Sequence, residues 1–162
     1  MSVPSTANST KGRKGKNRKG RVPIEGGLFV PITFDEQDSA AYISLTGNAA
    51  KLYCYLKRAA RTAASNGGTR ERDISFDFTY TEAKRRGFSE STFIRGIKEL
   101  WAKGFIDVTE RGGLRGTGRT NSHYKLAGYW QTFGKEWADR TAFQPDPFAK
   151  TSEPRRERDA RW

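Results

Sequence analysis

The side chains best suited to specific chemistry gather on one predicted helix, which begins near Ser89 and ends near Lys103. Apolar residues recur there at three- and four-residue steps, so one side of the helix should be buried. The polar residues left for the outer side are Ser89, Ser91, Thr92, Arg95 and Lys98. An arginine can donate two hydrogen bonds to O6 and N7 of guanine, whereas hydroxyl and ammonium groups can donate to phosphate. The predicted chemistry is therefore contact with bases and phosphates rather than catalysis.

A second predicted helix, residues 80–86, comes directly before this one. Gly87 between them can take the positive φ that a tight reversal needs, and Ser89 is a good N-cap for the helix that follows. Gly96 is unfavourable inside a helix, which indicates a close approach either of DNA or of a neighbouring helix. The order of elements predicts a helix-turn-helix, whose second helix fits the major groove.

Alternating apolar residues predict a strand over 105–109 and a return strand over His123–Leu126. The loop between them, residues 111–121, has four glycines, three arginines and no acidic residue, and we expect a long flexible turn. It lacks the Gly-x-x-x-x-Gly-Lys-Ser/Thr pattern of a catalytic phosphate-binding loop. A basic wing over a phosphate backbone or minor groove is favoured instead. Its candidate DNA contacts are Arg111, Arg115, Arg119, Thr120, Asn121 and His123.

The supporting elements are less distinctive. A helix with one apolar face is predicted from Thr46 to about Ala64, with Lys51, Lys57, Arg58 and Arg61 on its other sides. Residues 28–34 should be extended and pack an apolar strip against the domain, and residues 73–78 should form a half-buried strand. The aromatic side chains expected to close the core in a short helix or turn are Tyr129, Trp130, Phe133 and Trp137.

Both ends of the chain differ in composition from the predicted domain, which spans residues 28–140. Residues 1–27 should be a disordered arm that either solvates the protein or wraps DNA. Its candidate DNA contacts are Lys11, Arg13, Lys14, Lys16, Arg18, Lys19 and Arg21. Residues 141–162 are rich in proline and charge and should form a disordered tail, in which Trp162 could dock onto a partner protein.

The net charge of +12 favours an anionic partner, which could be nucleic acid, an anionic membrane or an acidic protein. No apolar run approaches the ~20 residues of a membrane span, so a cytoplasmic, nucleoid-associated protein is expected. One cysteine, Cys54, and one histidine, His123, cannot make a structural zinc site of the usual ligand types. Asp35, Glu36 and Asp38 are more typical of a helix start than of a metal site. We therefore expect no metal, no cofactor and no enzymatic activity.

The run SESTFIRGIKELWAKGFIDV, the glycine-rich loop and HYKLAGYW resemble winged helix-turn-helix proteins of phages, plasmids and integrated elements. The resemblance covers roughly residues 28–135 and implies an α+β fold of three helices, a small antiparallel β-sheet and a wing. The residues that carry it are Ser89, Thr92, Phe93, Ile97, Leu100, Gly104, Phe105, Ile106, Asn121, Tyr124, Leu126 and Trp130. Such domains serve as replication initiators, repressors and accessory factors.

These observations together predict a double-stranded DNA-binding protein that acts in transcription regulation or in replication-origin recognition of a mobile element. A homodimer is left open, because winged proteins can dimerise through almost any element. The alternatives are an RNA- or ribosome-binding basic protein and an adaptor that binds a protein through its winged domain. A nuclease is disfavoured, since the acidic residues are scattered along the chain.

Overall fold

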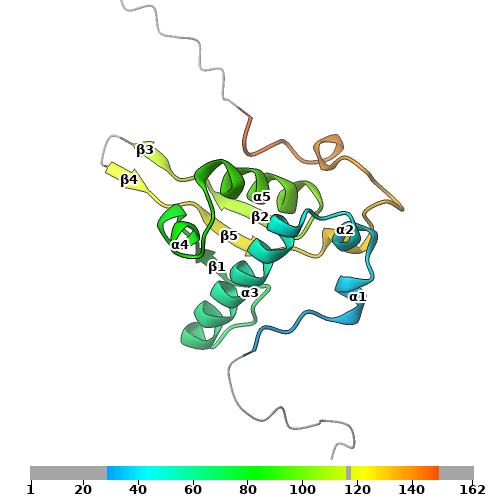
Figure 1. The fold of residues 1–162 in the computed structure, drawn as a ribbon, viewed down its shortest axis with the longest axis horizontal. Coiled ribbons are helices and arrows are strands. Elements are labelled where there is room, and N and C mark those ends of the chain that lie inside the picture. Colours follow the sequence, from blue (N-terminus) through cyan, green and yellow to red (C-terminus); the bar gives the residue numbers. More distant parts are fainter. Residues whose placement is uncertain (1–28, 116–117, 150–162) are drawn as a thin grey trace, which may run out of the picture.

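The computed structural model describes residues 29–115 and 118–149, which form an α+β domain with five α-helices and a three-stranded antiparallel sheet (Figure 1). The α-helices are α1 (Phe34–Gln37), α2 (Ala40–Ile43), α3 (Gly47–Gly67), α4 (Tyr80–Arg85) and α5 (Glu90–Ala102). The strands are β1 (Ser75–Asp77), β2 (Ile106–Glu110), β3 (Gly113–Arg115), β4 (Gly118–Thr120) and β5 (His123–Leu126). Two 3-10 helices follow, η1 (Tyr129–Gln131) and η2 (Arg140–Ala142).

Helix α3 is the longest element and packs against α5, β1 and β5. Thr46 caps its N-terminus as predicted, and Gly68, with φ 64°, caps its C-terminus, so the helix continues beyond the predicted end. Leu52 and Leu56 are fully buried, which confirms the apolar face. The expectation for Lys57 was wrong, because this lysine is only 6% exposed and pairs with a buried acid.

The sheet has the order β1-β5-β2, with every neighbouring pair antiparallel. Phe76 in β1 lies opposite Tyr124 in β5, and Ile106 in β2 lies opposite Leu126. All four side chains are buried, as the alternation of apolar and polar residues predicted. The inner face of the sheet therefore rests on α3 and α5, and its polar face points away from the core.

Beyond the three-stranded sheet, β3 and β4 pair with each other and project away from the helices (Figure 1). Leu114 of β3 lies opposite Arg119 of β4 in the register of this hairpin. The expectation of a long flexible turn was therefore wrong for these strands, because the glycine-rich segment pairs with itself through its backbone. We call β3 and β4 together the distal hairpin.

The segment before α1 differs from the prediction. Residues 29–33 have no regular secondary structure, and α1 begins at Phe34, whose side chain is 83% exposed rather than packed on the domain. Thr33 and Glu36 form a capping box at this helix start. The acidic residues here therefore begin a helix, as expected.

The chain after β5 closes the core. Trp130 in η1 is buried and stacks on Phe105, with ring centroids 6.1 Å apart. The predicted domain limit at Arg140 falls in η2, and the chain from there to Ala149 continues along the domain, so the expected start of the tail at residue 141 does not coincide with the end of the packed chain. The rest of the predicted tail and the whole predicted arm lie outside the described residues.

Candidate nucleic-acid interface

Local sequence signals set the start of α5. Gly87 has φ 85°, which lets the chain reverse after α4, and Phe88 is buried beside the turn. The backbone N–H of Thr92 donates to Oγ of Ser89 at 3.3 Å, so Ser89 is the N-cap that the sequence predicted. The hydroxyl oxygen of Ser89 is therefore already used in capping the helix.

The inner side of α5 anchors the helix on the core. The side chains of Phe93, Ile97, Leu100 and Trp101 are all buried, as their spacing predicted. A Cβ built on Gly96 would lie 2.9 Å from Cδ2 of Leu52 in α3. Gly96 therefore permits the close approach of a neighbouring helix, which decides between the two explanations left open by the sequence.

The outer side of α5 carries a stripe of exposed residues, Ser91, Ile94, Arg95 and Lys98, which we call the α5 stripe. They follow one another at helical spacing, so their side chains share one face. The stripe contains two cations and no acidic residue. Thr92 is half-buried and lies at its edge, so the predicted outward face is confirmed apart from this residue.

Ile94 is the member of the stripe that the sequence analysis did not select. Its side chain is 44% exposed although it is large and apolar. It lies one helical turn beyond Ser91 and one turn before Lys98. Helical spacing places this isoleucine at the edge of the apolar side, and that position was the signal present in the sequence.

The two cations of the stripe have different surroundings. Arg95 is exposed, and its Nε donates at 3.4 Å to the carbonyl oxygen of Ser91, one turn earlier. Lys98 is also exposed, but its Nζ lies 5.8 Å from the centre of the Phe148 ring. The guanidinium of Arg95 can turn outward at little cost, whereas the ammonium of Lys98 already has an aromatic neighbour.

The acidic residue nearest to the C-terminal end of the stripe is engaged elsewhere. Glu99 accepts hydrogen bonds from the backbone N–H and the hydroxyl of Thr46, and it pairs with Lys103 at 3.0 Å. Partial burial raises the pKa of the Glu99 carboxyl, but these hydrogen bonds outweigh burial and hold it below its usual range. Its charge is thus directed to α3 and to the end of α5, away from the stripe.

Apart from His123, the predicted wing residues divide into three groups. Arg111 is exposed, and its Nη1 donates to the carbonyl oxygens of Pro147 and Ala149 at 3.4 and 3.3 Å. Asn121 is exposed beside the distal hairpin. The third group lies in the distal hairpin, where the backbone places Arg115, Arg119 and Thr120.

His123 begins the return strand that the sequence predicted. It belongs to β5 of the three-stranded sheet, where it lies opposite Asp77 of β1. Its Nδ1 lies 2.6 Å from Oδ1 of Asp77. This histidine links two strands beside the base of the hairpin, and its ring is already engaged when a phosphate would approach.

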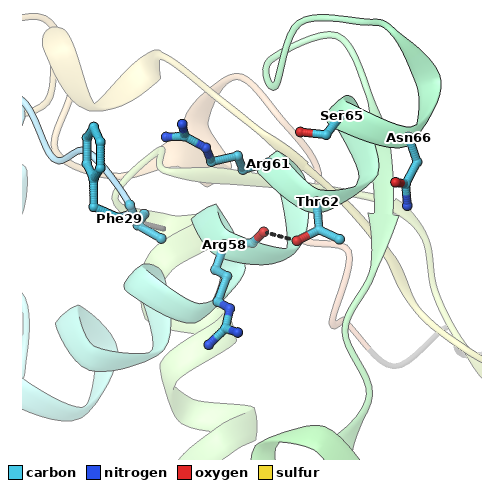
Figure 2. Close-up of a pocket in the computed structure, with 7 residues that line it drawn as sticks. Phe29, Arg58, Arg61, Thr62, Ser65 and Asn66 are labelled. Atoms are coloured by element: carbon cyan, nitrogen blue, oxygen red, sulfur yellow. Dashed lines mark hydrogen bonds between the residues drawn. The ribbon is translucent and has the colours of Figure 1, made fainter. Parts of the chain in front are cut away.

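A pocket of about 430 Å³ lies between the start of the described chain and α3, well outside the predicted interface (Figure 2). Its lining includes Phe29, Arg58, Arg61 and Ser65. The Arg61 guanidinium lies 5.2 Å from the centre of the Phe29 ring and within 4.0 Å of Glu71. The sequence analysis did not select this pocket, because Phe29 and α3 are distant in the chain.

Within the described ranges, no group of three or more His, Cys, Asp or Glu side chains is arranged to hold a metal ion. None of the helices in this part of the chain combines the length and the apolar character needed to cross a membrane. Cys54 is a free thiol on α3, and partial burial raises its pKa. Comparison of the chain with protein-family models, curated proteins and solved structures gave no match.

Proposed function

We propose that this chain is a non-enzymatic double-stranded DNA-binding protein of winged helix-turn-helix architecture. In this proposal α4, the turn at Gly87 and α5 form the helix-turn-helix, and the distal hairpin is the wing. The observation that carries the proposal is the α5 stripe: an N-capped helix buries its apolar side and places two exposed cations on one outer face. The exposed acid of the helix, Glu90, lies in its first turn and is not part of the stripe.

The dimensions of α5 suit the major groove. A helix of 13 residues is about 20 Å long, and the groove of B-DNA is ~12 Å wide, which admits one helix. Ser91, Ile94 and Arg95 lie in the half of α5 that usually meets base edges. The distal hairpin projects beside the helices, where a wing would meet the backbone (Figure 1). The net charge of +12 supplies the sequence-independent part of the affinity.

Each member of the stripe has a chemical role in this proposal. Arg95 pairs with O6 and N7 of guanine, and Lys98 and Ser91 donate to phosphate. Ile94 offers the apolar contact that a thymine methyl accepts. The cellular role that follows is transcription control or origin recognition of a mobile element, on the nucleoid. A homodimer on a palindromic site remains compatible with this arrangement.

The central test compares Arg95→Ala with the wild type on two duplexes. The first is a site selected from a random duplex pool in the presence of single-stranded DNA and RNA competitors, and the second is a scrambled duplex. We expect about 5- to 150-fold weaker binding to the selected site, because one bidentate contact is worth ~1–3 kcal/mol. Binding to the scrambled duplex should change far less. Fluorescence anisotropy measures both.

Lys135→Ala is the matched control, because it removes one exposed cation beyond η1. Lys135→Ala should weaken binding to both duplexes slightly and equally. Equal losses on both duplexes in Arg95→Ala would remove base recognition by this residue. Failure of the pool selection on duplex DNA, with enrichment of RNA competitors instead, would favour the alternative of an RNA-binding protein.

The contact assigned to Ile94 predicts a dependence on the thymine 5-methyl group. Replacing each thymine of the selected site by uracil, one at a time, should weaken wild-type binding about fourfold at one position, because a buried methyl is worth ~0.8 kcal/mol. In Ile94→Ala the same exchange should have no further effect. A position that responds equally in both proteins would show that another side chain contacts the methyl.

A further inference from the structure

The chain after η2 makes contacts of two very different strengths with α5 and the hairpin base. Arg140 is 1% exposed, and its Nη1 donates at 2.8 Å to the carbonyl oxygens of both Trp101 and Ile106. Its other nitrogens reach the carboxylate of Asp107 and the side-chain oxygen of Gln144. A buried, fully bonded guanidinium is costly to remove, so this part of the chain is firmly anchored.

Aromatic rings complete the anchor. The Arg140 guanidinium lies 4.9 Å from the centre of the Trp101 ring and 4.5 Å from that of Tyr129. Trp101 near the end of α5 and Tyr129 at the start of η1 therefore add cation–π contacts to the hydrogen bonds of the arginine. We call Arg140 with Gln144 the anchor.

Residues 145–149, which we call the strap, are held much more weakly. Phe148 is half-buried against the core, where its ring meets that of Trp101 edge to face, and the ammonium of Lys98 lies near the Phe148 ring. The strap also accepts two long hydrogen bonds from Arg111. These bonds measure 3.3 and 3.4 Å, and Arg111 is exposed to water, so each contributes little.

The position of the strap coincides with part of the proposed DNA surface. It contacts Lys98 on α5 and Arg111 at the base of the distal hairpin at once, so it bridges the two elements that should hold one phosphate backbone. Figure 1 shows this segment running over α5 toward β3. Asp146, whose carboxylate accepts from the N–H of Phe148 at 2.8 Å, adds a negative charge in the strap itself. Ser91, Ile94 and Arg95 lie on the part of α5 for which no strap contact is seen.

We propose that the strap is an autoinhibitory cover, which the phosphate backbone must displace from Lys98 and Arg111 while the anchor stays in place. This inference rests on the proposed function. A cover that is closed in most molecules lowers the apparent affinity by the fraction of molecules that are open. DNA would bind first through the part of the α5 stripe without strap contacts and would then compete with the strap for Lys98 and Arg111.

The test is Phe148→Ala in the full chain, with Phe143→Ala as the matched control. Phe143 is 52% exposed and contacts Tyr129 and Trp137 instead of α5. Binding of a duplex at low salt is measured by anisotropy, and the thermal midpoint of each variant shows that it is folded. We expect about 3- to 10-fold tighter binding by Phe148→Ala, the gain when the cover is closed in ~70–90% of molecules, and no change in the control.

A second measurement follows the strap itself. In 15N-labelled wild type, adding the duplex should move the amide signals of Phe148 and Ala149 toward random-coil positions, while the signals of Arg140 and Gln144 stay dispersed. Unchanged or weaker binding by a folded Phe148→Ala, or strap signals that stay fixed in the complex, would overturn the cover. If neither protein binds duplex DNA, the proposed function fails and the cover fails with it. If both bind equally well, only the cover fails.

Discussion

Replacing Gly104 by alanine should lower the free energy of unfolding by about 2–5 kcal/mol, as the sum of ~1–2 kcal/mol for a left-handed backbone and ~1–3 kcal/mol for overpacking. Gly104 has φ 81° at the end of α5. A Cβ there would lie 2.6 Å from Cβ of Tyr129 and 2.7 Å from the backbone nitrogen of Trp130. The backbone of η1 cannot retreat freely, because the Trp130 N–H donates to the carbonyl oxygen of Gly104 at 3.2 Å.

Gly87→Ala is the control that separates the two costs. Gly87 has nearly the same dihedral, φ 85°, but a Cβ there would meet nothing within 4 Å. The free energy of unfolding of Gly87→Ala should therefore fall by only the ~1–2 kcal/mol that the left-handed conformation costs. Urea unfolding of both variants gives the comparison. Equal losses would show that η1 yields to the extra methyl group and that the approach of η1 to Gly104 does not restrain the fold.

Lys57→Met should lower the free energy of unfolding by about 3–5 kcal/mol at pH 7, because it leaves a buried carboxylate without its cation. Nζ of Lys57 lies 2.9 and 2.7 Å from the two carboxylate oxygens of Glu36, and both residues are buried. The hydroxyl of Tyr53 donates to the same carboxylate at 2.8 Å, and its pKa is strongly raised by burial and by that negative charge. The triad joins α1 to α3.

The sign of the pH dependence follows from Glu36. Burial raises the pKa of its carboxyl, but hydrogen bonds from Lys57, Thr33 and Tyr53 outweigh burial and place it below the usual range. In the wild type this group contributes stability above its unfolded pKa of ~4.3, and that contribution is lost as the pH falls through the lower native value. In Lys57→Met, protonation removes the unpaired buried charge of the Glu36 carboxyl. The loss of unfolding free energy relative to the wild type should therefore become smaller as the pH is lowered from 7 to 4.

The double variant Glu36→Gln with Lys57→Met completes this prediction. Removing the charge as well as its partner should recover part of the stability at pH 7 and should remove most of the pH dependence between pH 4 and pH 7. A deficit of Lys57→Met that is the same at both pH values would show that lost packing of the lysine stem, rather than an unpaired Glu36, causes the destabilisation.

Local signals predicted the elements that carry the candidate site. The apolar spacing of Phe93, Ile97 and Leu100 predicted α5 and its buried side, and Ser89 predicted where the helix begins. The alternation in β5 predicted the burial of Tyr124 and Leu126. These features depend on neighbours within a few residues, for which helical and strand periods are sufficient evidence.

Local sequence patterns did not predict the pairing of side chains that are distant in the chain. Lys57 was placed outside the apolar face of its helix, and its burial was not predicted, because its partner Glu36 lies in another helix. Arg140 stands in a stretch without apolar periodicity, and its burial depends on carbonyl oxygens at the ends of α5 and β2. Those acceptors come together only when the chain has folded.

The amino-acid sequence alone predicted α3, α4, α5 and the strands of the three-stranded sheet, the apolar sides of these elements, and a net charge of +12. It did not predict the bounds of α1, the helix α2 or the distal hairpin. Only the tertiary structure decided that Gly96 faces Leu52, that Ile94 is exposed within the α5 stripe, and that the strap reaches Lys98 and Arg111. The physical reason is distance along the chain. Backbone propensity and periodicity act over a few residues, whereas burial and pairing of a side chain depend on what the fold brings against it.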